Sequence, residues 1–103
     1  IGWLVGLAAL GLGCVSVGQE FDPQRVPDLE IGVSQREDVR RLLGDPWRTG
    51  IEDGLPTWTY AHYRYSVFSP VRTRDLIVRF DGEGVVRSYG FNSTYEQDRA
   101  LGR

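Results

Sequence analysis

The chain holds few side chains that could carry out covalent or acid–base chemistry. Its 103 residues include one cysteine, Cys14, and one histidine, His62. A nucleophile–histidine catalyst would have to use His62, and no serine or acidic residue lies at a motif spacing from it. A single cysteine also excludes an internal disulfide, and no metal-ligand spacing is present. The sequence therefore predicts a non-enzymatic protein without a metal or cofactor, in which His62 is a structural or surface residue.

The charged residues do not mark a functional cluster either. Acidic and basic residues number 14 and 12, which gives a net charge of −2, and the two signs are interspersed. A nucleic-acid binder would show a basic stripe, so we expect no nucleic-acid partner. The glycine-rich segment 82–84 joins two predicted strands, whereas a phosphate-binding loop would precede a helix.

Cys14 stands where a lipid-attachment cysteine would stand. It follows an uncharged, apolar and glycine-rich run. The run is too short for a typical membrane-spanning helix, which needs about 20 apolar residues, and it fits the hydrophobic region of a signal peptide. Leu10–Cys14 resembles a bacterial lipobox, although Gly11 takes the place of a branched apolar residue. We expect residues 1–18 to be a signal peptide with lipid on Cys14, or alternatively a membrane anchor containing an incidental cysteine.

The best-marked structural element is a short helix between Gly32 and Pro46. Ser34 and Glu37 have the spacing of a capping box, with Ser34 as the N-cap. Gly44 and Pro46 are typical of a helix end. The apolar side chains fall on one face: Val39, Leu42 and Leu43. So short a helix is not stable alone, so it must pack on another element.

The chain between the leader and this helix gives weaker signals. Residues 15–20 look like a mobile tether. Asp22 could cap a helical turn that starts at Pro23 and is limited by Pro27, or the stretch could be an irregular arm. Three residues are expected to point inward: Val26, Leu29 and Ile31.

Three strands are predicted downstream, with residues 93–103 as a flexible tail. The strands cover Thr57–Val67, Arg74–Asp81 and Val85–Asn92. The turn 81–84 should join the last two as an antiparallel hairpin. The core face of the second strand should carry Leu76, Val78 and Phe80. The predicted fold is thus a two-layer α+β domain over residues 19–92, with one or two short helices on a three-stranded antiparallel sheet.

The segment from Trp47 to Pro56 is interpreted as a loop between the helix and the first strand. Apolar residues on a connection either cover the core or form a recognition surface. The candidates for partner contacts are two strand tyrosines and the loop residues: Trp47, Ile51, Leu55, Tyr60 and Tyr63. Tyr60 could instead belong to the core.

Several short motifs, in this order, resemble the SmpA/OmlA family of small outer-membrane lipoproteins, also called BamE. The first runs from Gly32-Val33-Ser34 through Val39 to Leu43-Gly44-x-Pro46. The second is Trp58-x-Tyr60 at the first strand. The third is the closing hairpin, Leu76-x-Val78-x-Phe80-Asp81 with Gly84-Val85 after the turn. The similarity to the family extends over residues 26–89.

The resemblance implies a BamE/BLIP-like domain anchored by lipid on the periplasmic face of the outer membrane. It implies contacts with other envelope proteins, among them subunits of the β-barrel assembly machinery, and with anionic phospholipid. Val15 is not the aspartate that retains lipoproteins in the inner membrane of enteric bacteria. The sequence of the loop 47–56 differs from the one that is commoner in the family. The family's partner-binding residues are therefore not assigned to positions in this loop. Alternatives are a related envelope lipoprotein, a subunit of a membrane complex held by an uncleaved N-terminal helix, and a protein-binding or inhibitor domain.

Overall fold

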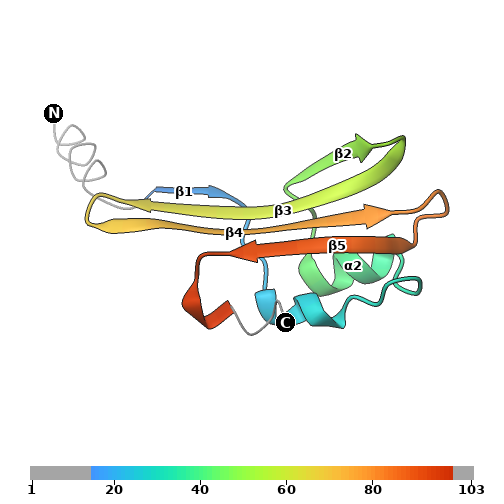
Figure 1. Ribbon diagram of the computed structural model, residues 1–103, viewed down its shortest axis with the longest axis horizontal. Helices are drawn as coiled ribbons and strands as arrows, with labels where there is room; N and C mark the ends of the chain where they lie inside the picture. The colour runs from blue at the N-terminus through green and yellow to red at the C-terminus, as the bar shows by residue number, and fades with distance from the viewer. Residues whose placement is uncertain (1–14, 99–103) are drawn as a thin grey trace, which may run out of the picture.

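The computed structural model describes residues 15–98 and shows an antiparallel sheet with helices on one face (Figure 1). Cys14, the rest of the leader and the end of the predicted tail, residues 99–103, lie outside the described residues. The α+β class is confirmed, but the sheet has five strands where three were predicted. In chain order the elements are β1 (Val15–Gly18), the 3₁₀-helix η1 (Pro23–Asp28), α2 (Arg36–Leu43), β2 (Arg48–Glu52), β3 (Leu55–Ser66), β4 (Ser69–Phe80) and β5 (Val86–Ser93).

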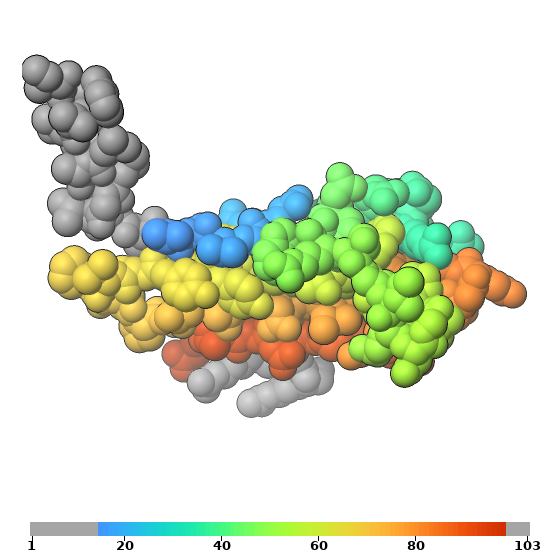
Figure 2. Space-filling view, turned by 90° about the horizontal axis from the view of Figure 1, so that it is seen from above, coloured from blue at the N-terminus to red at the C-terminus, as the bar shows by residue number. Residues whose placement is uncertain are grey.

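The two additional strands lie along one edge of β3. The sheet order is β1-β3-β4-β5, and β2 also pairs with β3. β1 is antiparallel to residues 62–65 and β2 to residues 55–59, so the two short strands follow each other along that edge (Figure 2). The expectation that residues 15–20 form a mobile tether was therefore wrong for β1. Its ladder partner is distant in sequence, so local pattern did not reveal it.

The predicted loop at 47–56 is instead a β-hairpin. Asp53 and Gly54 both have positive φ, 53° and 79°, which suits the tight turn between β2 and β3. Asp-Gly is a common sequence for such turns, so the signal was present. Strand β4 also begins earlier than predicted, at Ser69 rather than Arg74.

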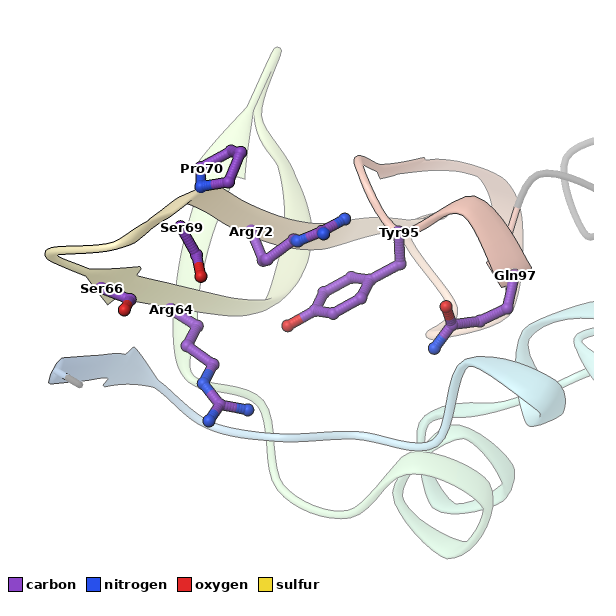
Figure 3. A pocket seen from close by; sticks show the side chains of 7 residues that line it. All are labelled: Arg64, Ser66, Ser69, Pro70, Arg72, Tyr95 and Gln97. Carbon is purple, nitrogen blue, oxygen red and sulfur yellow. The ribbon is translucent and has the colours of Figure 1, made fainter. Parts of the chain in front are cut away.

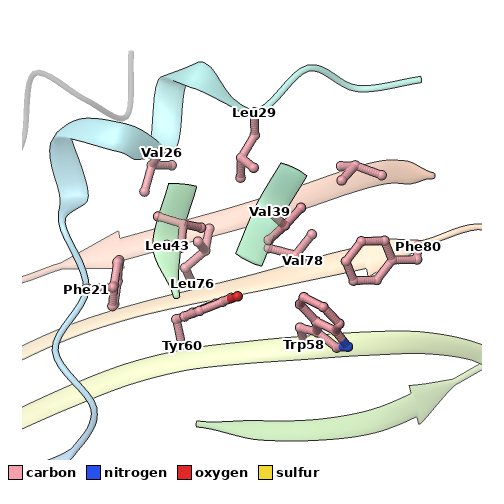
Figure 4. Packing of buried hydrophobic residues seen from close by; sticks show 11 residues of the cluster. Phe21, Val26, Leu29, Val39, Leu43, Trp58, Tyr60, Leu76, Val78 and Phe80 are labelled. Carbon is pink, nitrogen blue, oxygen red and sulfur yellow. The ribbon is translucent and has the colours of Figure 1, made fainter. Parts of the chain in front are cut away.

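The core lies between the helices and one face of the sheet, which we call the inner face (Figure 4). The predicted core residues of β4 are confirmed, with 0% exposure at Leu76, Val78 and Phe80. Val26 and Leu29 are also buried as expected. Ile31 was predicted to be inward but is 59% exposed, because it lies in the turn between η1 and α2.

Helix α2 begins one residue later than predicted. Its N-cap is Gln35, which forms a capping box with Asp38 in place of the expected Ser34 and Glu37. The hydroxyl of Ser34 instead accepts a hydrogen bond from the Glu30 amide over 2.9 Å. Ser34 therefore fixes the approach to the helix, while the predicted end at Gly44 is confirmed.

Helix η1 follows the sequence signals at its start. The carboxylate of Asp22 accepts a hydrogen bond from the Gln24 amide over 3.0 Å, and Pro23 is the first helical residue. Pro27 does not end the helix, because the tighter 3₁₀ turn continues through it to Asp28.

The described part of the predicted tail packs on the sheet. The Asp98 carboxylate is buried and accepts hydrogen bonds from Arg74 Nε and Ser93 Oγ, both over 2.6 Å. The guanidinium of Arg74 also lies 4.3 Å from the ring centroid of Tyr95. Residues 93–98 thus form a fixed turn, in contrast to the flexible tail that was expected. Within residues 15–98, no helix is long and apolar enough to cross a membrane.

Candidate protein-contact site

The face of the sheet opposite the helices, the outer face, carries a cluster of apolar and aromatic side chains. Successive residues of a strand point to opposite faces, so Tyr63 and Tyr65 lie on the face opposite Tyr60. In the β1–β3 register, Val17 is paired with Tyr63 and Val15 with Tyr65, which brings these side chains together. We define the outer-face patch by six residues: Val15, Val17, Trp47, Tyr63, Tyr65 and Val71.

The patch contains an aromatic pair that is held in place by its neighbours. The rings of Trp47 and Tyr63 meet edge to face, with centroids 6.3 Å apart and planes at 80°. The guanidinium of Arg48 lies 4.3 Å from the centroid of the Trp47 ring. The backbone of Trp47 is fixed as well, because its amide donates to the Thr59 carbonyl over 2.9 Å. A large aromatic surface is therefore presented in one orientation.

The remaining members extend this surface toward the β3–β4 hairpin. Exposure is 58% for Val15, 40% for Val17, 43% for Tyr65 and 47% for Val71. Single exposed apolar residues are normal, whereas a contiguous set on one face is typical of an interaction site. The arrangement can bury apolar and aromatic area against a partner.

The structure divides the five contact residues that the sequence predicted. Trp47 and Tyr63 come together in the outer-face patch. Ile51 and Leu55 lie nearer the β2–β3 turn, where Ile51 is 79% exposed and does not cover the core. Tyr60 is 1% exposed, so its ring belongs to the core and cannot contact a partner.

Sequence reasoning missed the members of the patch that flank Tyr63. Val15 and Val17 alternate with Ser16, a period-2 pattern that was available but too short to stand out. Tyr65 was placed in the first predicted strand, whereas Val71 lay outside all three predicted strands. Their proximity depends on the register of β3 with β1 and β4, which only the fold supplies.

His62 lies on the inner face, away from the patch. It is 7% exposed, and its Nε2 atom is 4.0 Å from a carboxylate oxygen of Glu20, which is itself well exposed. Its Nδ1 atom has no hydrogen-bond partner among the described residues. His62 is therefore a buried residue that lies opposite Arg74 in the β3–β4 register.

Comparison with known proteins bears on the whole domain. Residues 18–90 match a protein-family model described as "Outer membrane protein assembly factor BamE domain". The matched range runs from the end of β1 into β5 and includes both helices, so it covers the elements that form the core. No curated protein sequence matches the chain.

Proposed function

Because this chain belongs to the BamE family of outer membrane protein assembly factors, we propose that it is a non-enzymatic, lipid-anchored periplasmic module that works by contact. The family match over residues 18–90 supports a role in outer-membrane protein assembly and envelope integrity. The observation that carries the contact role is the outer-face patch. It faces away from the helices and is open to a partner, for which another subunit of the assembly machinery is the expected occupant.

The composition of the patch suits a protein interface. Tryptophan, tyrosine and arginine dominate the residues that contribute most to binding free energy. Trp47 is already oriented by Arg48 and Tyr63, so less side-chain entropy is lost when a partner binds. We propose Trp47 and Tyr63 as the centre of the contact, with the valines of β1 excluding water around them.

The anchor is proposed at Cys14. Two or more acyl chains, at about 0.8 kcal/mol per buried methylene, give stable attachment where a single chain does not. Val15 follows Cys14 directly and is paired with Tyr65. The proposed attachment point is thus one residue away from the outer-face patch. Partners held at the same membrane could therefore reach the patch.

Site-specific photo-cross-linking in the native host tests this proposal. A photoreactive phenylalanine analogue at Tyr65 should cross-link the protein to another assembly subunit. The same analogue at Glu83, an exposed residue in the β4–β5 turn, is the matched control and should give no such product. Equal products from both positions, or none from Tyr65, would contradict a contact through the patch.

The exposed aromatic residues also support a second candidate, a protein-binding or inhibitor domain outside the assembly machinery. Such a module would use the same patch, because the side chains of Trp47 and Tyr63 can pack against either kind of partner protein. The cross-linking experiment separates the two candidates. A product with an envelope protein that is not an assembly subunit, and with no assembly subunit, would favour the second.

A further inference from the structure

Strand β5 forms one edge of the sheet, and most of its free side has no neighbouring strand. It is the last strand in the sheet order, and Figure 2 shows it along the border opposite β1 and β2. Its beginning is covered, because the Val86 amide donates to the Ser34 carbonyl over 2.8 Å and the Val86 carbonyl accepts from the Gly32 amide over 2.7 Å. Beyond Val86, no strand or loop within residues 15–98 pairs with this side of β5.

The pairing with β4 determines which backbone groups point to the free side. The Thr94 amide donates to the Thr73 carbonyl, so the backbone of Thr94 is directed at β4. In an antiparallel ladder this direction alternates from one residue to the next. The even-numbered residues of 88–92 therefore bond to β4, whereas Tyr89 and Phe91 direct their amides and carbonyls away from it. These two residues present a row of donors and acceptors that a further strand could use.

The free part of β5 also lacks the features that usually protect an exposed edge. Edge strands are commonly short, charged or interrupted by proline, which prevents unwanted pairing. β1 and β2 have only four and five residues. The part of β4 that extends past β5, residues 69–72, carries Pro70 and Arg72, and Tyr95 lies beside it across a cavity (Figure 3). Residues 88–93 of β5 contain neither a charge nor a proline, so this edge is open to pairing.

The side chains along the free edge differ between the two faces of the sheet. Tyr89 and Phe91 are paired with the buried residues Val78 and Leu76, so they lie on the inner face, where they are only partly buried. The residues that alternate with them on the outer face are small or polar: Ser88, Gly90 and Asn92. Cross-strand neighbours pack against each other, so an added strand should carry apolar residues opposite Tyr89 and Phe91 and can carry polar residues between them.

From these groups we propose that the free edge of β5 binds an extended segment of an unassembled outer-membrane protein as an additional antiparallel strand. Strand addition takes affinity from backbone hydrogen bonds and specificity from alternate side chains. The strands of outer-membrane barrels alternate apolar and polar residues, which is the pattern that Tyr89 and Phe91 favour. The choice of this occupant rests on the assembly role proposed above, whereas the open edge does not.

A second copy of this chain is a less suitable occupant. Val15 is paired with Tyr65 near the β3–β4 hairpin, at one end of the sheet (Figure 1). Two copies that pair antiparallel through β5 would therefore have their Val15 residues at opposite ends of the joined sheet. Two chains anchored at Cys14 in one membrane do not suit that arrangement, and an extended segment of another protein has no such constraint.

Amide exchange measured by NMR on the full chain in detergent micelles tests the edge residue by residue. The probe is a short peptide in which valine and threonine alternate, with a lysine at each end. At saturation the peptide should slow exchange of the Tyr89 and Phe91 amides roughly tenfold, because these amides gain a hydrogen bond. The Gly90 amide already bonds to β4 and should change little. Unchanged exchange at Tyr89 and Phe91, or protection that appears only in β1 or β2, would overturn the proposal.

Two N-methylated forms of the peptide are a matched pair of probes. In an antiparallel ladder, residues opposite Tyr89 and Phe91 exchange both backbone bonds with them, so the valine amides face β5 and the threonine amides face away. Methylation of the valine amides should weaken binding roughly tenfold, because each lost hydrogen bond lowers the affinity. Methylation of the threonine amides should leave it nearly unchanged. Fluorescence anisotropy of the labelled peptides measures both, and equal losses would contradict pairing through the backbone.

A variant of the strand tests the same bond from the other side. Phe91→Pro removes an amide of the free row, and proline is tolerated on an edge strand where the N–H does not face the neighbouring strand. Phe91→Ala loses the same ring but keeps the amide, so it is the matched control. The proline variant should bind the peptide roughly tenfold more weakly than the alanine variant. Equal affinities would show that the Phe91 amide is not used.

Two further outcomes separate this inference from its neighbours. A dimer in light scattering that Phe91→Pro converts to a monomer would assign the edge to a second copy and overturn the proposed occupant. The peptide assays contain no assembly subunit, so their failure leaves cross-linking at Tyr65 unaffected. Peptide binding at β5 without any cross-link at Tyr65 would in turn reject the contact through the outer-face patch and leave the strand addition intact.

Discussion

The hydroxyl of Tyr60 donates a hydrogen bond to the carbonyl of Gly44 over 2.8 Å, and this bond ties the centre of β3 to the end of helix α2. The last carbonyls of a helix have no partner within the helix, so the phenol satisfies one of them. Burial raises the pKa of Tyr60 well above its usual range, so the hydroxyl keeps its proton. The bond therefore joins the Leu43-Gly44-x-Pro46 and Trp58-x-Tyr60 motifs in space.

Removal of this hydroxyl should destabilise the domain without opening the core. We expect Tyr60→Phe to lower the free energy of unfolding by about 1–2 kcal/mol, because the Gly44 carbonyl loses its partner. Urea denaturation followed by tryptophan fluorescence measures the change. Tyr65→Phe, at an exposed tyrosine, is the control and should stay within about 0.5 kcal/mol of the parent. Equal stability of Tyr60→Phe and the parent would show that water replaces the bond.

The same residue predicts a dependence on alkaline pH. The pKa of Tyr60 is raised in the folded state above its ordinary value of 10.0, chiefly by burial. Its contribution to stability is therefore complete below pH 10.0 and is lost as the pH rises above that value, where the unfolded chain ionises first. Urea midpoints should fall more steeply above pH 10.0 in the parent than in Tyr60→Phe. Parallel curves would contradict the role assigned to burial.

The elements that the sequence predicted well are those whose signals are local. Gly44 and Pro46 mark the helix end, and the turn 81–84 marks the closing hairpin. The alternation of Leu76, Val78 and Phe80 with polar residues identified the core face of β4. Two of the six residues of the outer-face patch, Trp47 and Tyr63, had also been predicted as contact residues from the sequence.

What the sequence did not reveal depends on contacts between distant residues. Local pattern favours Ser34-x-x-Glu37, which has the usual capping-box sequence, over Gln35-x-x-Asp38 one residue later, which the structure uses. The choice follows from Ser34, whose hydroxyl is used by the Glu30 amide and whose carbonyl accepts from the Val86 amide over 2.8 Å. Strand β1 likewise depends on a distant segment, because residues 15–18 pair with residues 62–65 of β3.

Two carboxylates should make the domain sensitive to acid. A hydrogen bond from the Gln35 amide, and to a smaller extent one from Arg41, holds the pKa of the Asp38 carboxyl below its usual range. Hydrogen bonds from the Val85 and Glu83 amides lower the pKa of Asp81 in the same way. A lowered folded-state pKa gives stability that is present above the unfolded value of 3.8 and is lost as the pH falls through the folded value. When the pH is lowered below 3.8, the urea concentration at the unfolding midpoint should decrease in the parent. It should decrease less in the double variant Asp38→Asn/Asp81→Asn. Identical acid slopes would contradict this assignment.

The turn after β5 should depend on one buried ion pair. Asp98→Ala leaves Arg74 without its partner at a site where the arginine side chain is 13% exposed, and we expect a loss of about 3 kcal/mol. Thermal and urea unfolding measure it. Glu96→Ala, an exposed acid in the same turn, should have little effect. Arg74→Met combined with Asp98→Leu should recover part of the loss, and additive losses would show that the pair is not coupled.

Gly18 should be required for the attachment of β1. Its φ is +96°, and a Cβ atom there would lie 2.1 Å from the Ala61 carbonyl oxygen, which accepts from the Gln19 amide. Gly18→Ala should therefore remove hydrogen-exchange protection from β1. Gly32→Ala is the matched control, because Gly32 has a similar φ of +83° but open space around it. Equal effects on β1 would mean that backbone strain, and not the contact with β3, determines the result.

The intact mass of the mature protein, purified from membranes of its own host, decides how the domain is held. We expect a chain that begins at Cys14 and carries a diacylglyceryl group and a further acyl chain, because these together hold a protein at a membrane more firmly than one chain does. The variant Cys14→Ser should keep residues 1–13 and lack the added mass. A parent protein that retains the residues before Cys14 without lipid would contradict the lipoprotein assignment. Attachment would then depend on the apolar leader itself.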